Sequence, residues 1–189
     1  MNKILKIAGY TLAAIVTVLT TGCGGDVLPK PNAYLRLDYP EPEYVAYQDG
    51  CAYSFAVNSM ARVQSKEDCS HTIQYPQMKA TVYLTYKAVN NDITNLLRDA
   101  QTLTYKHVVK ADGIQEQPFA NADKKVYGMF YQVGGDAATN AQFYVTDSLR
   151  HFVTGSVYFY AKPNYDSLMP ATSYIKDDMR NIMETIKWK

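Results

Sequence analysis

The chain has no excess of charge of either sign. Its 189 residues include 19 lysines and arginines and 18 aspartates and glutamates. Lys3 and Lys6 lie in an N-terminal segment that we expect to be cleaved and that contains no acid, which leaves 17 (19 minus 2) basic residues against 18 acidic ones. Nucleic-acid-binding domains normally present a basic surface, so we expect no nucleic-acid partner.

Histidine and cysteine are also scarce, with three of each. They come together only in Cys69-Ser70-His71. Metal sites usually need three or four ligands at recognisable spacing, and no further ligands cluster near this tripeptide, so no metal ligand is predicted. A Cys–His hydrolase would require one of the cysteines to meet a histidine in the fold, but we interpret His107 and His151 as structural residues.

Other marks of an enzyme are missing. Gly134-Gly135-Asp136 joins two expected strands, so it lacks the helix N-terminus that phosphate-binding loops use. The 18 acidic residues offer many pairs of the kind that glycosidases use, but none stands in a distinctive context, and Asp177-Asp178 is expected on a solvated helix face. We therefore expect a non-enzymatic protein without catalytic residues, metal or cofactor.

Long hydrophobic runs are absent as well. The longest, Ile7–Leu19, has 13 residues, fewer than the roughly 20 that a helix needs to span a bilayer. Two lysines precede this run, and the small residues Thr20-Thr21-Gly22 follow it, directly before Cys23. A basic, an apolar and a small segment in this order are typical of a secretion signal, and the cysteine after them resembles a lipobox. We predict a signal peptide over residues 1–22 and lipidation of Cys23.

The lipobox departs from the usual pattern, because Leu19 lies four residues before the cysteine instead of three. The alternative is an ordinary cleaved signal followed by a coincidental cysteine. Several acyl chains such as palmitate, each contributing about 0.8 kcal/mol per buried CH₂, would anchor the protein stably in a membrane. Gly24 follows Cys23 in place of the aspartate that favours inner-membrane retention, so we expect the periplasmic face of the outer membrane.

The region after the cysteine reads as a tether. Residues 23–50 contain Gly24-Gly25 and four prolines, and both residue types disfavour regular structure. A single folded domain is predicted over residues 51–189, which is long enough to bury a core.

Within that domain, alternating β-branched and aromatic residues predict strands, and apolar residues at three-to-four spacing predict two amphipathic helices. The expected strands are Cys51–Val57, Thr72–Tyr75, Lys79–Tyr86, Ile114–Phe119, Lys125–Val133, Ala141–Thr146 and His151–Tyr160. One helix is expected from Asp92, through His107 and Val108, to Gly113, and the other from Ser167 to Trp188. We predict an α+β fold in which two helices cover an antiparallel sheet. The element order is similar to that of the MOG1/PsbP-like α/β/α sandwich.

Cys51 and Cys69 remain once Cys23 is assigned to lipid. In an oxidising compartment a disulfide between them is expected, closing a loop of about 19 residues and contributing about 3 kcal/mol. Two buried thiols or one reactive thiol are the alternatives.

Seven stretches together carry a resemblance to a known family and cover most of the chain after about residue 51: Tyr75–Tyr86, Asp99–Asp112, Lys125–Met129, Asn140–Ser148, His151–Tyr160, Lys162–Pro170 and Glu184–Lys189. In these stretches the chain resembles the gliding-motility lipoprotein GldD family. The resemblance implies a non-enzymatic envelope lipoprotein required for gliding and associated with the type IX secretion machinery, whose proteins would be its partners. The family has no agreed catalytic residues.

The resemblance also suggests a set of polar and aromatic interaction residues. These are Tyr105, Lys106, His107, Tyr144, Asp147, His151, Lys162, Asn164 and Tyr165. The simpler interpretation is turn chemistry, since Asp147-Ser148 and Pro163-Asn164 are typical turn sequences.

An alternative function, a periplasmic module for a small molecule or lipid, predicts an enclosed apolar pocket between sheet and helix.

Overall fold

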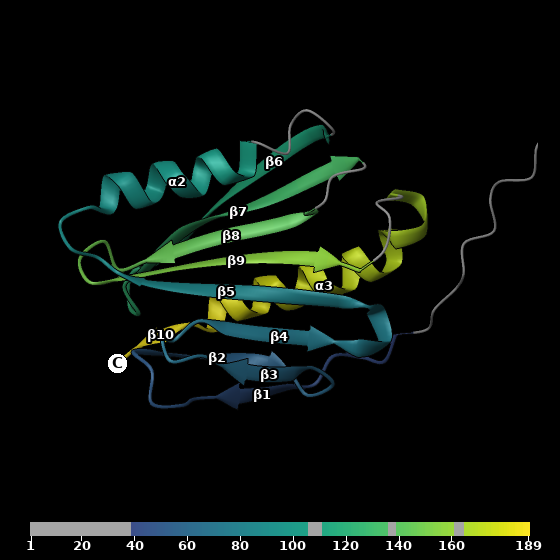
Figure 1. Ribbon diagram of the computed structural model, residues 1–189, viewed down its shortest axis with the longest axis horizontal. Helices are drawn as coiled ribbons and strands as arrows, with labels where there is room; N and C mark the ends of the chain where they lie inside the picture. The colour runs from purple at the N-terminus through teal and green to yellow at the C-terminus, as the bar shows by residue number, and fades with distance from the viewer. Residues whose placement is uncertain (1–38, 106–110, 136–138, 161–164) are drawn as a thin grey trace, which may run out of the picture. The chain divides into compact units, whose positions relative to one another are not determined.

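The computed structural model describes residues 39–105, 111–135, 139–160 and 165–189, all of which belong to one compact unit (Figure 1). The predicted signal peptide, Cys23 and most of the predicted tether lie outside the described residues.

The described residues form strands and two helices in an α+β arrangement, and every strand pairing is antiparallel, as predicted. The elements are β1 (Tyr44–Tyr47), β2 (Tyr53–Asn58), β3 (Arg62–Ser65), β4 (His71–Tyr75), the 3₁₀ turn η1 (Pro76–Met78), β5 (Ala80–Ala88), α2 (Ile93–Tyr105), β6 (Ala111–Asn121), β7 (Val126–Gly135), β8 (Ala141–Thr146), β9 (His151–Phe159), α3 (Tyr165–Thr185) and β10 (Lys187–Trp188).

A seven-stranded sheet is the larger of two sheets, in the order β3-β4-β5-β9-β8-β7-β6 (Figure 1). Its centre is a pairing between strands distant in sequence, β5 and β9, which runs from Ala80↔Phe159 to Ala88↔His151. The remaining neighbours in the sheet are consecutive strands of the chain, as the strand patterns predict.

The smaller sheet has the order β1-β2-β10. In it, β1 pairs with β2 from Tyr44↔Asn58 onward, and β10 pairs with the opposite side of β2 through Lys187↔Ser54. Two predictions need correction. The fold includes Tyr44–Tyr47, so it begins before Cys51, and the C-terminal helix ends at Thr185 instead of continuing to Trp188.

The main core lies between α3, β2 and one face of the large sheet. Helix α3 contacts β2, β7 and β8. Its apolar residues Ile175, Met179, Ile182 and Met183 recur at three-to-four spacing and are fully buried, as is Ile186 directly after the helix. They join one cluster with Phe55, Ile73, Val82, Phe130, Phe143, Val145 and Val157. Each such side chain contributes about 1.5–3 kcal/mol when it is fully buried.

Helix α2 contacts the other face of the large sheet. Thr104 of α2 donates to the Gln142 side chain of β8 at 3.1 Å. The next residue, Phe143, packs in the α3 cluster, and consecutive strand residues point to opposite faces. The predicted continuation of this helix to Gly113 is wrong, because α2 ends at Tyr105 and β6 begins at Ala111.

Two glycines of the large sheet lie where a Cβ atom has no room. A Cβ on Gly155 of β9 would overlap the Phe143 ring, and one on Gly128 of β7 would overlap the backbone carbonyl oxygen of Tyr144. Gly113 of β6, by contrast, has no atom within 4 Å of such a Cβ.

Candidate functional site

A disulfide joins Cys51 and Cys69, with 5.5 Å between their Cα atoms. This confirms the predicted pairing. Cys51 lies before β2 and Cys69 before β4, so the bond ties together the starts of strands from the two sheets.

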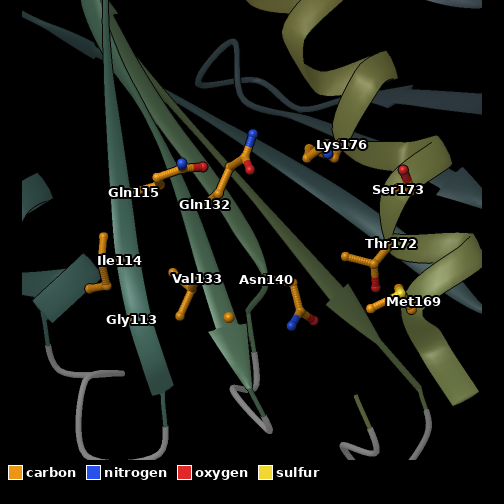
Figure 2. Close-up of a pocket in the computed structure, with 11 residues that line it drawn as sticks. Gly113, Ile114, Gln115, Gln132, Val133, Asn140, Met169, Thr172, Ser173 and Lys176 are labelled. Carbon is orange, nitrogen blue, oxygen red and sulfur yellow. The ribbon is translucent and has the colours of Figure 1, made fainter. Parts of the chain in front are cut away.

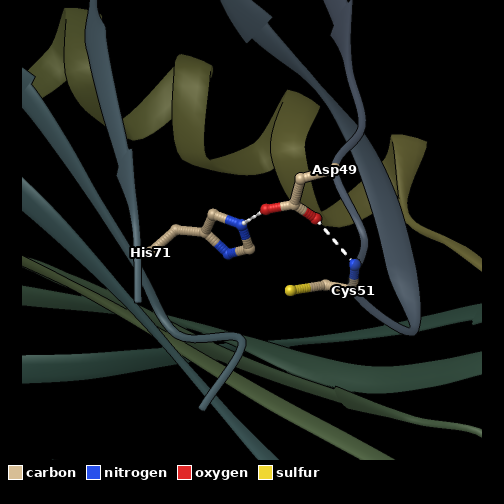
Figure 3. A group of neighbouring side chains, drawn as sticks. All are labelled: Asp49, Cys51 and His71. Atoms are coloured by element: carbon tan, nitrogen blue, oxygen red, sulfur yellow. Dashed lines mark hydrogen bonds and ion pairs between the residues drawn. The ribbon is translucent and has the colours of Figure 1, made fainter. Parts of the chain in front are cut away.

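A chain of hydrogen bonds around the buried His71, which we call the Asp49 network, lies beside this disulfide; Figure 3 shows three of its residues, Asp49, Cys51 and His71. The Asp49 carboxylate accepts from His71 Nε2 at 2.8 Å, from the Ser65 hydroxyl at 2.7 Å and from the Cys51 amide at 3.0 Å. The Tyr53 hydroxyl is 2.7 Å from His71 Nδ1. Both ring nitrogens of His71 are therefore engaged, and its side chain is fully buried.

The composition of this group argues for a structural role. Oxygen, sulfur and nitrogen ligand atoms of Asp49, Cys51 and His71 lie within 4.8 Å of one another, which resembles a metal-ligand set. However, the Cys51 sulfur is bonded to Cys69 and cannot serve as a thiolate. The two ligands that remain are fewer than the three or four that metal sites use. Both ring nitrogens of His71 bond to protein groups, and its fully buried side chain offers no surface to a substrate.

The network changes the ionisation of Asp49. Burial raises the pKa of this carboxyl, but hydrogen bonds from Ser65, His71 and the Cys51 amide outweigh it and lower the pKa to about 2, from an ordinary value of 3.8. The ionised form is thus favoured in the folded state. Its contribution to stability is fully present above the ordinary pKa and is lost as pH falls through about 2.

We therefore expect Asp49→Asn to destabilise the protein at neutral pH, and the difference from the parent to shrink as pH falls from 3.8 through about 2. Urea unfolding across this pH range measures both free energies of unfolding. Asp123→Asn, at an exposed position, controls for the loss of one negative charge. A parent–variant difference that does not change with pH would contradict the role assigned to the Asp49 network.

An open groove lies between α3 and the paired ends of β6 and β7 (Figure 2). Its volume is about 580 Å³, within the range of about 300–1,000 Å³ typical of ligand sites. We call it the α3 groove. It is lined by Gly113, Ile114, Gln115, Gln132, Val133, Gly134, Asn140, Met169, Thr172, Ser173 and Lys176. Among these described lining residues one side chain is cationic and none is acidic.

The comparison with known protein families decides where this chain belongs. The model of the family described as gliding motility lipoprotein GldD matches residues 24–188, nearly the whole chain. The chain belongs to the GldD family. The match includes every described strand and helix, the disulfide and the α3 groove. No curated protein matches the chain at a significant level.

The family is described as one of gliding motility lipoproteins. Membership in it indicates that the chain is anchored to a membrane through lipid. Among the described residues, no helix is both long enough and apolar enough to cross a bilayer.

Of the interaction residues suggested by the GldD resemblance, four have described side chains. Asp147 closes the β8–β9 turn, where its carboxylate accepts from the amides of Leu149, Arg150 and His151. His151 is buried and stacks on Trp188 at 5.2 Å between ring centroids, and burial lowers its pKa.

The other two residues, Tyr105 and Tyr144, lie on the side of the large sheet that α2 contacts. Tyr105 is exposed and donates to Glu116. Tyr144 stacks on Phe152 at 5.7 Å, and because Phe152 follows His151 directly in β9, Tyr144 and His151 point to opposite faces of the sheet. The described residues of this set therefore do not converge on one site. Lys106, His107, Lys162, Asn164 and the side chain of Tyr165 lie outside the described part of the chain.

Asp178 is buried and does not lie on the solvated helix face expected for Asp177-Asp178. It is 1% exposed, accepts from Tyr44 at 2.7 Å and Asn58 at 3.0 Å, and burial raises its pKa. The carboxylate thereby joins α3 to β1 and β2. A signal existed, because residue 178 lies three positions after Ile175 and one before Met179, within the apolar stripe of α3.

Proposed function

We propose that this chain is a non-enzymatic envelope lipoprotein that acts as a component or assembly factor of the gliding motility and type IX secretion machinery. The observation that carries the proposal is the family match over residues 24–188. In this proposal residues 1–22 direct export, Cys23 carries the lipid, and the domain faces the periplasm from the outer membrane.

The proposal extends to the fold type. The seven-stranded antiparallel sheet, which α2 contacts on one face and α3 on the other, supports a domain of the MOG1/PsbP-like α/β/α kind, with helices covering the sheet. Such a domain would act through its surface. The engaged nitrogens of His71 and the closed turn at Asp147 support a scaffold in which polar groups hold the fold together.

The alternative function, binding of a small molecule or lipid, predicts an enclosed apolar pocket. The α3 groove is open, and amides, hydroxyls and one ammonium group contribute to its lining. This chemistry favours a polar ligand over a lipid.

Deletion of the gene in the bacterium that encodes the chain tests the proposed function. We expect the deletion to remove type IX cargo proteins from the culture medium, because the secretion machinery would lack a part. Mass spectrometry of the medium measures the loss. The parent chain should restore secretion, and Cys23→Ala, which cannot be lipidated, should not.

Crosslinking of the native lipoprotein in the envelope, followed by affinity purification, supplies a second measurement. Recovery of secretion or motility proteins is the expected result. An unchanged set of secreted proteins in the deletion strain, with its outer membrane intact, would contradict the proposal. A periplasmic marker protein that stays inside the cells serves as the integrity control.

A further inference from the structure

The α3 groove holds polar side chains that have no partner within the described structure. Lys176 makes no ion pair or hydrogen bond with any described residue, and neither do the side chains of Gln115 and Gln132. Met169, Thr172 and Lys176 lie at three-to-four spacing, so they share the face of α3 that borders the groove (Figure 2). Unused donors and acceptors around a concave surface are available to a ligand.

The positive charge in the α3 groove favours a ligand that carries a negative charge. Lys176 supplies an ammonium group with three donors, and the described lining contains no carboxylate to neutralise it. Nearby Asp178 is turned into the protein, where it accepts from Tyr44 and Asn58. A ligand with a negative group can therefore pair with Lys176 without meeting an acid of the lining.

The side-chain amides of Gln115 and Gln132 favour a ligand that has hydrogen-bond donors and acceptors of its own. Gln115 and Gln132 occupy directly opposite positions on β6 and β7, so their side chains lie next to each other on the same sheet face. Each carboxamide both donates through its NH₂ group and accepts through its oxygen. This pair matches the N–H and C=O groups of a peptide unit, and Met169 on the neighbouring face of α3 provides apolar contact for a small side chain.

We propose that the α3 groove binds a short peptide end, with its C-terminal carboxylate on Lys176 and its last peptide groups on Gln115 and Gln132. This inference goes beyond the proposed machinery role and does not depend on it. Binding is measured on the purified full-length lipoprotein in detergent, so a failure here would leave the secretion assay unaffected.

The test uses a mixed pool of N-acetylated tripeptides with free C-terminal carboxylates, titrated into the protein by calorimetry, beside the same pool with amidated C-termini. We expect saturable binding of the first pool and binding of the amidated pool weaker by at least about tenfold, because a hydrogen-bonded charge is lost. Lys176→Gln should weaken binding of the free-carboxylate pool by a similar factor. Lys87→Gln, which removes a lysine at the end of β5, should change it less than about twofold.

Gln115→Leu with Gln132→Leu separates peptide recognition from simple anion binding. The double variant should bind the tripeptides more weakly while leaving the weak binding of acetate unchanged. Absence of saturable binding by the free-carboxylate pool would overturn the proposal. Equal binding of both pools, unchanged binding by Lys176→Gln, or tripeptides that bind no tighter than acetate would also overturn it. Thermal unfolding of each variant shows whether it is folded.

Discussion

Alanine at position 128 is expected to lower the free energy of unfolding by about 3 kcal/mol or more, at or above the upper end of the usual range for overpacking. Gly128 lies in β7, an interior strand of the large sheet, opposite Val145 of β8. Its Cβ would overlap the Tyr144 carbonyl oxygen. That atom belongs to the backbone of a paired strand, so no side-chain rotation can relieve the overlap, and β7 and β8 would have to separate locally.

Urea unfolding of the purified protein measures the effect as a shift of the midpoint at unchanged slope. Gly113→Ala is the matched control, since it makes the same substitution in neighbouring β6 with nothing within 4 Å of the new Cβ. It should change stability by less than about 0.5 kcal/mol. If Gly128→Ala does not yield folded protein while Gly113→Ala does, the expectation also holds. Equal midpoints for Gly128→Ala and the parent would show that β8 can move aside at little cost.

The double substitution Cys51→Ala and Cys69→Ala should cost about 3 kcal/mol, chiefly because the unfolded chain regains the freedom of the closed loop. For a domain of this size, that corresponds to a melting temperature lower by roughly 6–12 °C. The sequence separation of 18 residues sets the size of the effect in this entropic account. Thermal unfolding followed by circular dichroism measures it.

Reduction provides the internal control for this prediction. A reductant should lower the melting temperature of the parent by a similar amount and leave the double variant unchanged. The Asp49 network adds to the effect, because the Cys51 amide donates to Asp49 and the Cys69 carbonyl accepts from Tyr53. A double variant as stable as the parent would mean that packing around β2 and β4 holds the loop without the covalent bond.

Much of the fold could be predicted from the sequence because its longer elements carry strong periodic patterns. The alternation in Ala80–Ala88 and the apolar stripe of α3 are examples. The short strands β1, β3 and β10 escaped prediction. Two to four residues contain too few repeats to show a period, and their pairing partners are fixed by packing elsewhere in the fold. For β10, tertiary contacts of Trp188 overrode the helical pattern that precedes it.

Of the candidate sites, too, some could be predicted from the sequence and others could not. The disulfide could be predicted because only two cysteines remain after Cys23. The α3 groove could not, since Gln115, Gln132 and Lys176 are ordinary surface residues in the sequence, and only the packing of α3 against the sheet brings them together. Asp178 lies within the apolar stripe of α3, but a carboxylate normally indicates a solvated position, and only its bonds to Tyr44 and Asn58 explain its burial.

The small sheet has a consequence for how the protein reaches its native state. Its central strand β2 pairs with β10 across a separation of 133 residues (187 minus 54), and Lys189 donates to the Asp49 carbonyl. Because a chain is synthesised from its N-terminus to its C-terminus, the small sheet cannot be completed until residues 187 and 188 have left the ribosome. Folding rates fall as contacts become more distant in sequence. The small sheet can therefore be completed only after the whole chain is available, which makes its closure a late step in folding.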